Sequence, residues 1–149
     1  MQYSKNGLLL TEGFESCRLV AYQDIRGIWT IGWGHTGPEV CEGLTWTQDQ
    51  ADAQLLADVQ SSVAAINADV TVPLTQDEFD ALVDFAFNVG NTALRNSTLL
   101  KKLNAGDYAG AANEFDRWDK AAGQVIAGLL RRRQKETDLF NTPDGATNG

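Results

Sequence analysis

Residues 47–90 hold two helical segments that each carry their own start signal, and this pair constrains the fold more than any other feature. Thr47 to Gln50 and Thr75 to Glu78 both match the capping box, in which the two side chains exchange hydrogen bonds with the backbone of the first turn. Pro73 separates the segments, because proline cannot continue a helix. One apolar face follows the first box at helical spacing: Leu55, Val59, Val63, Ile66 and Val70. The sequence therefore predicts a long helix over about 47–70 and a second helix after Thr75.

The second helix is predicted to lie at the centre of a core. Its sequence "FDALVDFAFNVG" is apolar on most faces and ends at Gly90, a residue that commonly follows the last helical turn. Shorter helices are expected around 97–103, 108–118 and 127–140, separated by "NAGD" and "KAAGQV". The final "NTPDGATNG", residues 141–149, is predicted to be a flexible tail.

The N-terminal third changes from a helical to a strand pattern. Ser4 is a suitable helix cap, and apolar residues then recur at helical spacing until a predicted end near Ser16. From Arg18 to Trp33 the period is two, which predicts a hairpin with Asp24 in its turn. Trp29 and Trp33 fall on one strand face and are predicted to be mainly core. The layout is one domain over 1–149: a small β lobe at about 18–46, the connecting helix, and a helical lobe at about 74–140 that includes the N-terminal helix.

Charge and cysteine content exclude several classes of protein. The net charge of −8 would repel a phosphate backbone, so no nucleic-acid partner is expected. The single basic cluster, "RRRQKE" at 131–136, is interpreted as a solvated or internally paired helix face. Cys17 and Cys41 fit no metal-ligand spacing with His35, so no metal is expected, and both thiols are predicted to be free and buried, although a disulfide stays open. The N-terminus has no signal-peptide core or membrane span, so no stable membrane insertion is expected.

Two acids near the hairpin are plausible partners for glycosidic chemistry. Hydrolysis of a glycosidic bond uses one protonated carboxyl group and one carboxylate. Glu15 falls at the end of the first helix beside Phe14, where the helix dipole and the apolar neighbour would raise its pKa. Asp24 falls in a polar turn that would keep it ionised, and Thr30 is placed to help it hold a water. By themselves, however, an acid in a helix and an acid in a turn are ordinarily surface charges.

The spacing of these residues resembles a known family. Glu15, eight residues, Asp24, five residues and Thr30 is similar to the catalytic pattern of the phage-type lysozymes, glycoside hydrolase family 24. The segments "FESCRLVAYQD", "GIWTIGWGHTG", "LTQDEFDALVDFAFNVGNTALRNSTLL" and "FDRWDKAAGQVIAGLLRRRQKETDLF" resemble the same family in the same order. The family's glutamate is commonly followed by glycine, as Glu12 is here, but the spacing to Asp24 favours Glu15.

The resemblance implies an α+β fold, mostly helical and lysozyme-like, and an endolysin that hydrolyses the β-1,4 bond between N-acetylmuramic acid and N-acetylglucosamine in peptidoglycan. Glu15 would be the general acid, and Asp24 with Thr30 would place water or stabilise the cationic sugar, with inversion implied. No cofactor is implied. A monomer that acts on glycan strands is expected, made in the host cytoplasm and reaching the periplasmic cell wall through holin lesions.

Further residues are candidates for supporting roles. Gly32, His35 and Asn88 are candidate substrate contacts, although a structural hydrogen bond is favoured for His35 and helix capping for Asn88. The family pattern places paired arginines at Arg132 and Arg133, one of which is predicted to pair with Glu15, while Arg132 and Glu136 also lie at i,i+4.

Two other functions remain compatible with the residues alone. A lytic transglycosylase breaks the same bond with one glutamate and no water, although Asp24 and Thr30 favour water. A catalytically silent peptidoglycan-binding module needs only the glycine-lined and aromatic surface of the hairpin. In that module the two acids would be dispensable.

Overall fold

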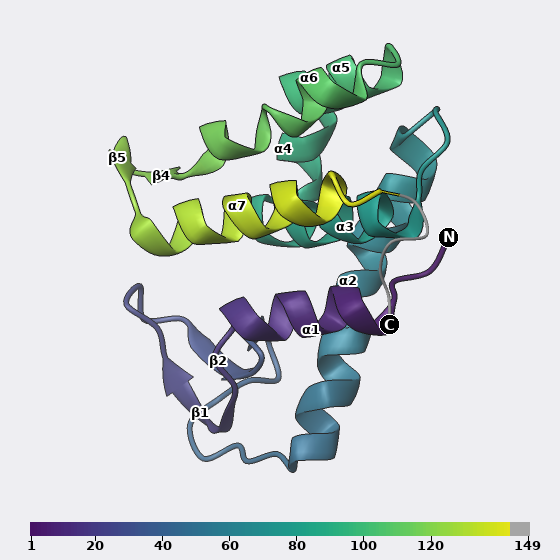
Figure 1. The fold of residues 1–149 in the computed structure, drawn as a ribbon. Coiled ribbons are helices and arrows are strands. Elements are labelled where there is room, and N and C mark those ends of the chain that lie inside the picture. Colours follow the sequence, from purple (N-terminus) through teal and green to yellow (C-terminus); the bar gives the residue numbers. More distant parts are fainter. Residues whose placement is uncertain (144–149) are drawn as a thin grey trace. The chain divides into compact units, whose positions relative to one another are not determined.

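The computed structural model describes residues 1–143, and residues 144–149 of the predicted tail lie outside the described part. The α+β class, mostly helical, is confirmed. The contacts within the chain divide it into two compact units: the smaller unit is Thr11–Gln60, and the larger unit is Met1–Leu10 with Ser61–Gly149. The elements in chain order (Figure 1) are α1 (Lys5–Phe14), β1 (Arg18–Gln23), β2 (Trp29–Gly32), β3 (His35–Thr36), α2 (Gln48–Asp69), α3 (Gln76–Val89), α4 (Asn91–Arg95), α5 (Thr98–Asn104), α6 (Tyr108–Ala112), the 3-10 helix η1 (Phe115–Trp118), β4 (Lys120–Ala121), β5 (Gln124–Val125) and α7 (Ala127–Phe140).

The smaller unit contains a three-stranded antiparallel sheet in the order β1-β2-β3, where the sequence predicted only a hairpin. Thr30 lies in the middle strand and pairs with Tyr22 on one side and Thr36 on the other. The third strand escaped prediction because it is only two residues long, too short to show a period.

The core of the smaller unit is small, and the expectation of a core position is wrong for one of its two tryptophans. Ile31 is fully buried and Trp29 packs half-buried against it, but Trp33 is half-buried and does not belong to this cluster. The indole N–H of Trp33 donates to Asp52 Oδ1 at 2.9 Å, so the polar edge of this ring lies beside an exposed carboxylate. Half-burial suits an indole ring, which has an apolar body and a polar edge.

Both predicted capping boxes are present, and they begin the two long helices. At α2, Gln50 N donates to Thr47 Oγ1 at 3.1 Å while Thr47 N donates to Gln50 Oε1 at 2.8 Å. At α3, Thr75 and Glu78 exchange the same pair of bonds, and Gly90 follows the last turn with φ of 103°. Because each box satisfies backbone N–H groups that have no partner inside the helix, the start of each helix was readable from sequence.

The larger unit packs around α3, as predicted for a central core helix. Figure 1 shows α7 running beside α3, and their side chains join one cluster that includes Phe79, Phe85, Phe115 and Phe140. The aromatic rings of Phe85 and Phe115 meet edge to face, with centroids 5.3 Å apart. The predicted helix at 127–140 is confirmed as α7.

One local expectation in the larger unit was wrong, and two short elements were not predicted. Residues 91–95 form the short helix α4, which shows no long apolar period because it has only one buried residue, Leu94. The helix expected over 108–118 is divided into α6 and η1. The separator "KAAGQV" forms the β4-β5 hairpin, whose turn residues Ala122 and Gly123 both have positive φ, the geometry that suits a two-residue hairpin turn.

The two cysteines are free thiols, but the expectation that they are buried was wrong. Cys17 is half-buried just after α1, and Cys41 is exposed. Cys41 lies between β3 and α2, outside any helix or strand, so no second layer of structure covers it. None of the helices in the described part of the chain is long and apolar enough to span a bilayer.

Candidate active site

Glu15 lies in the smaller unit, one residue beyond the end of α1. Its backbone N–H donates to Thr11 O at 3.0 Å, which continues the helical pattern of α1 by one residue. Its carboxylate lies against Gly34, because a Cβ built on that glycine would be 3.3 Å from Glu15 Oε2. Gly34 also has φ of +82°, which a larger residue would adopt only with strain. The turn between β2 and β3 therefore needs glycine for its backbone, and the missing side chain leaves room for this carboxylate.

Asp24 opens the turn between β1 and β2, and backbone donors hold its carboxylate. Asp24 Oδ1 accepts from Arg26 N at 2.8 Å and from Ile28 N at 2.9 Å. The Ile28 N–H has the largest effect and lowers the pKa of Asp24, the slight burial of the group raises it, and the Arg26 backbone and side chain lower it further. The net shift is downward, so the turn holds Asp24 as an anion at neutral pH.

Thr30 is buried in β2, and both its hydroxyl and the Asp24 carboxylate form hydrogen bonds with the backbone of Ile28. Thr30 Oγ1 donates to Ile28 O at 3.0 Å, while Ile28 N donates to Asp24. The structure therefore links Asp24 and Thr30 through the backbone of Ile28. Because the hydroxyl proton is already donated, the Thr30 oxygen is left to act as an acceptor.

Gly32, at the end of β2, is explained by packing inside the smaller unit. A Cβ on this residue would lie 2.9 Å from the ring of Trp46 and 3.4 Å from Ala51 Cβ. Glycine is thus required for the Trp46 ring to reach the sheet. Contact of Gly32 with substrate stays a prediction.

His35, at the start of β3, is held between two carboxylates. Its Nδ1 lies 2.8 Å from Asp58 Oδ2 on α2, and its Nε2 lies 2.6 Å from Glu39 Oε1. The ring also lies against Trp46, with centroids 5.6 Å apart. Partial burial lowers the pKa of His35, but the hydrogen bonds and charges of Glu39 and Asp58 outweigh burial and raise the pKa above its ordinary value. This geometry is a structural hydrogen-bonding arrangement, the role that the sequence favoured for His35.

The pKa shift of His35 predicts a pH-dependent contribution to stability. Because the folded pKa is raised above the unfolded value of about 6.5, protonated His35 stabilises the fold fully below pH 6.5, and this contribution is lost as pH rises through the folded pKa. His35→Asn should therefore be less stable than wild type at pH 5.5, and the difference should narrow as pH rises to 9. Urea unfolding at several pH values measures this difference. If the difference in the free energy of unfolding between wild type and His35→Asn stays constant from pH 5.5 to 9, the charge of His35 does not stabilise the fold.

The other predicted site residues lie in the larger unit, where Arg132 and Asp84 form a buried pair. Arg132 donates through Nε and Nη2 to the two oxygens of Asp84, at 2.9 and 2.8 Å. The predicted i,i+4 contact with Glu136 is present at 3.9 Å, but Asp84 on α3 is the closer acid. The signal for Asp84 was a charged residue in a helix that is apolar on most faces, since such a charge requires a buried partner.

Arg133 is fully buried, and its guanidinium contacts are all within the larger unit. Its Nη2 donates to Asn88 Oδ1 at 2.9 Å and to Glu136 Oε2 at 3.0 Å. Its Nε lies 2.7 Å from Glu136 Oε1 as an ion pair whose angle falls short of a hydrogen bond. The guanidinium also lies over the Phe85 ring at 5.0 Å. Asn88, which was expected to cap α3, instead orients Arg133.

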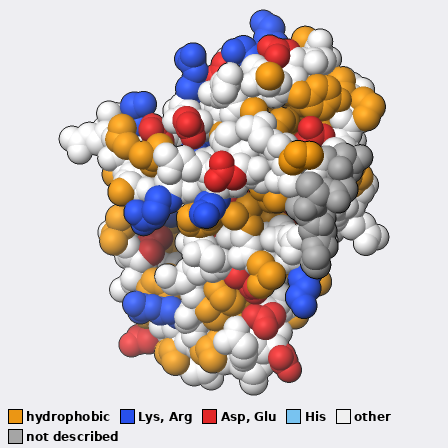
Figure 2. Space-filling view, viewed as in Figure 1, with side chains coloured by type: hydrophobic (Ala, Val, Ile, Leu, Met, Phe, Trp, Pro, Cys, Tyr) orange, Lys and Arg blue, Asp and Glu red, His pale blue; other side chains and the backbone are white. Residues whose placement is uncertain are grey.

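Burial shifts the pKa values of Arg133 and Glu136 in the directions that favour the neutral form of each group. Desolvation lowers the pKa of Arg133, which Glu136 partly offsets, and desolvation raises the pKa of Glu136 well above its ordinary value. Each group therefore depends on the other to remain charged without contact with water. The internal pairing predicted for the "RRRQKE" cluster is present at Arg132 and Arg133. On the face drawn in Figure 2, Lys and Arg side chains lie in several separate places with Asp and Glu side chains among them.

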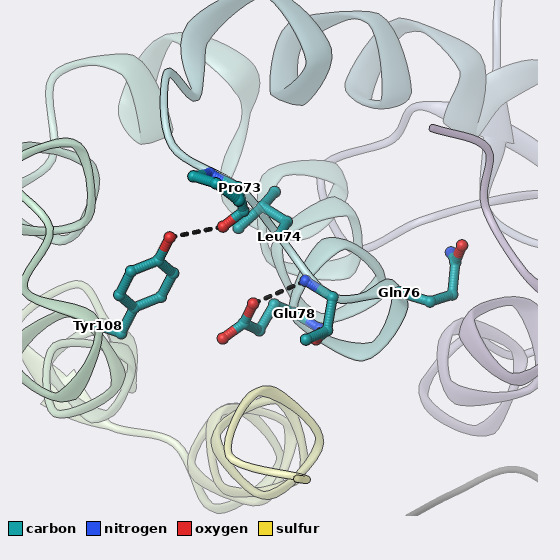
Figure 3. A pocket seen from close by; sticks show the side chains of 6 residues that line it. Pro73, Leu74, Gln76, Glu78 and Tyr108 are labelled. Carbon is teal, nitrogen blue, oxygen red and sulfur yellow. Dashed lines mark hydrogen bonds between the residues drawn. The ribbon is translucent and has the colours of Figure 1, made fainter. Parts of the chain in front are cut away.

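A pocket of about 590 Å³ on the larger unit contains none of the predicted site residues. It is lined by Pro73, Leu74, Thr75, Gln76, Glu78 and Tyr108. Figure 3 shows that its polar groups bond within the chain: the Tyr108 hydroxyl donates to Pro73 O at 2.6 Å, and Thr75 N donates to Glu78 Oε1. Within residues 1–143, no group of three or more His, Cys, Asp and Glu side chains is arranged to hold a metal ion.

Comparison with known proteins covers nearly the whole chain. The sequence profile described as phage lysozyme matches residues 12–136. An endolysin of Acyrthosiphon pisum secondary endosymbiont phage 1 is 45% identical over 146 residues, which cover 95% of this chain and 99% of that protein. A SAR-endolysin of Escherichia phage Mu is 45% identical over 127 residues, which cover 85% of this chain and 74% of that protein.

A solved structure gives the same result at the level of the fold. The muramidase domain of SpmX from Asticaccaulis excentricus superimposes with a TM-score of 0.88 at 42% sequence identity, covering 95% of this chain and 99% of that one. The predicted lysozyme-like fold is thereby confirmed. The matched residues 12–136 include every site residue predicted from the sequence.

Proposed function

The chain belongs to the phage lysozyme family, and from this membership we propose which residues carry its reaction. The protein is an endolysin with muramidase activity, a hydrolase of the β-1,4 bond between N-acetylmuramic acid and N-acetylglucosamine in peptidoglycan. It acts on the bacterial cell wall, and its activity lyses the host. The assignment of roles to individual side chains is our proposal.

Glu15 is the general acid, and Asp24 is the carboxylate that activates water. The observation that carries this assignment is the hydrogen bonding of Asp24, whose two backbone donors favour the anion. Glu15 lies in the same unit, just beyond the end of α1 and beside Gly34. Two carboxyl groups in different surroundings suit the two roles that glycoside hydrolysis requires.

Thr30 positions the water that Asp24 activates. The water donates one hydrogen bond to the Asp24 carboxylate and the other to Thr30 Oγ1, which acts as an acceptor because its own proton goes to Ile28 O. The water oxygen then attacks the anomeric carbon, and its proton passes to Asp24. Glu15 gives its proton to the departing glycosidic oxygen. Attack from the face opposite the leaving oxygen inverts the anomeric configuration.

Removing the Thr30 hydroxyl tests this role. Thr30→Val keeps the shape of the side chain but cannot accept a hydrogen bond, so kcat should fall by about 10²-fold with little change in KM. Thr30→Ser keeps the hydroxyl and should retain most of the activity. The measurement is release of reducing ends from purified peptidoglycan, with circular dichroism to verify the fold. Equal activity of the Val and Ser variants would rule out the proposed water contact.

That one of Arg132 and Arg133 pairs with Glu15 remains a proposal, which rests on the family pattern of paired arginines. A guanidinium paired with Glu15 would hold the carboxylate formed after proton transfer. Gly32, His35 and Asn88 remain proposed substrate contacts.

The remaining proposals concern assembly and release. We propose that the protein works as a single catalytic domain and a monomer, without a nucleic-acid partner. The net charge of −8 and the internal pairing of Arg132 and Arg133 support the last point. For release we propose synthesis in the host cytoplasm and passage through holin lesions. Expression in cells with and without a holin distinguishes this route, since lysis without a holin would contradict it.

A further inference from the structure

The smaller unit has very few positive charges. Residues 11–60 contain two arginines, Arg18 and Arg26, and no lysine. The same residues contain eight acids: Glu12, Glu15, Asp24, Glu39, Glu42, Asp49, Asp52 and Asp58. An anionic substrate that approaches this unit therefore meets mostly repulsion, and the position of each arginine matters.

The two arginines have different surroundings. The guanidinium carbon of Arg18 lies 4.4 Å from the centroid of the Tyr22 ring, a cation-π contact within β1. The Arg26 side chain is 72% exposed and lies in the turn that begins with Asp24. Both arginines are exposed, but only Arg26 lies in the turn of the proposed catalytic carboxylate.

Arg26 contributes to the Asp24 turn mainly through its backbone. Its N–H donates to Asp24 Oδ1 at 2.8 Å, whereas its Nη2 is 3.4 Å from Asp24 Oδ2, a long contact for a charged pair. An exposed ion pair of this kind stabilises little. The geometry of the turn does not require a guanidinium at this position, because the backbone donors hold Asp24 whichever side chain follows.

The substrate supplies an anion close to the sugar that Asp24 would serve. Every N-acetylmuramic acid residue carries a lactyl ether, and in peptidoglycan this group is extended by a peptide stem that bears carboxylates. The attacked anomeric carbon and the lactyl ether belong to the same sugar ring. A guanidinium two residues from Asp24 is therefore well placed for that peptide, and its planar donors match a carboxylate.

We propose that Arg26 is a specificity-determining residue that binds a carboxylate of the peptide stem on the muramic acid at the cleavage site. This inference rests on the proposed function, because it takes Asp24 as the carboxylate beside the reacting sugar. Arg26 then favours glycan strands that carry acidic peptides over bare strands. Sequence patterns alone do not indicate this role, since an arginine in a polar turn is an ordinary solvated charge.

The test compares three forms of one peptidoglycan preparation from which other wall polymers have been removed. The first form is intact, the second has its carboxylates converted to amides with carbodiimide and ammonia, and the third has its peptides removed by an amidase, which leaves only the lactyl carboxylate. Arg26→Gln should lower kcat/KM on the intact form by about fivefold, mainly through KM. It should match wild type on the other two forms. Arg26→Lys should lie between the two on the intact form, because it keeps the charge without the planar donors.

Arg18→Gln is the matched control, since it removes the other arginine of the same unit and should show no dependence on the form of substrate. An equal loss for Arg26→Gln on all three forms would mean that Arg26 acts through Asp24, which overturns the proposal. A loss on intact and amidase-treated strands, but not on the amidated form, would indicate that Arg26 binds the lactyl carboxylate and not the peptide, which overturns the proposal. No loss on any form would also overturn the proposal. Glu15→Gln and Asp24→Asn should lose activity on all three forms. If these two variants lose activity on all three forms, and the effect of Arg26→Gln does not depend on the form of the substrate, the inference about Arg26 fails while the proposed function stands.

Discussion

Glu15→Gln is expected to lower kcat/KM for peptidoglycan by about 10³-fold. Glutamine has the same shape as a protonated glutamate, but its amide cannot give a proton to the departing glycosidic oxygen. The fold should be unaffected, because the backbone N–H of residue 15 and its bond to Thr11 O are unchanged. Reducing-end release and clearing of cell-wall suspensions measure the loss.

Glu12→Gln is the matched control for this experiment. Glu12 lies one turn earlier near the same end of α1 and is followed by glycine, so it is the rival for the role of general acid. We expect it to retain wild-type activity. Pelleting with insoluble peptidoglycan adds a second readout, and Glu15→Gln should still bind. If Glu15→Gln hydrolyses as fast as wild type, Glu15 is not the acid, and if Glu12→Gln is the inactive variant, the roles must be exchanged.

Arg133→Met is expected to lower the free energy of unfolding by about 3–5 kcal/mol. The change removes the nearest partner of the buried Glu136 carboxyl group and leaves only Arg132, 3.9 Å away, and breaking a buried ion pair costs about that much. Burial already raises the pKa of Glu136 well above its ordinary value, so part of the loss would be relieved by proton uptake. Chemical unfolding at pH 7 measures the change. Arg131→Met is the control, because Arg131 is exposed on the same helix and its loss should change stability little.

The double variant Arg133→Met, Glu136→Leu separates the loss of the charge pair from the loss of volume. With both charges replaced by apolar side chains, most of the lost stability should return. The pH–activity profiles of Arg132→Met and Arg133→Met add a readout of function, since the loss of a guanidinium paired with Glu15 should move the profile. If Arg133→Met is no less stable than Arg131→Met, the buried pair does not support the fold. Unchanged pH–activity profiles in both Arg132→Met and Arg133→Met would remove the proposed pairing with Glu15.

Features set by residues close together in the sequence were predicted well. The boxes at Thr47 and Thr75 begin their helices through bonds between residues three apart, and Gly90 ends α3 through its own backbone geometry. The Asp24 turn is equally local, because both donors to its carboxylate lie within four residues of it. Such contacts are available to the chain before any distant segment arrives, so the sequence alone specifies them.

Features that depend on distant partners were missed. Arg132 and Asp84 are 48 residues apart, and Arg133 meets Asn88 across 45 residues, so helical spacing could name only the neighbour Glu136. The contact of Glu15 with Gly34 and the exposure of Cys41 likewise depend on how strands and loops pack.

The sequence by itself determined the starts of α2 and α3, the end of α3, the Asp24 turn and, through its spacing of Glu15, Asp24 and Thr30, the family of the protein. Only the tertiary structure decided which charges are buried together and which arginine of the smaller unit lies over the ring of Tyr22. The physical reason is that burial and long-range ion pairs arise when separate elements exclude water from one another, and no local pattern records which elements will do so.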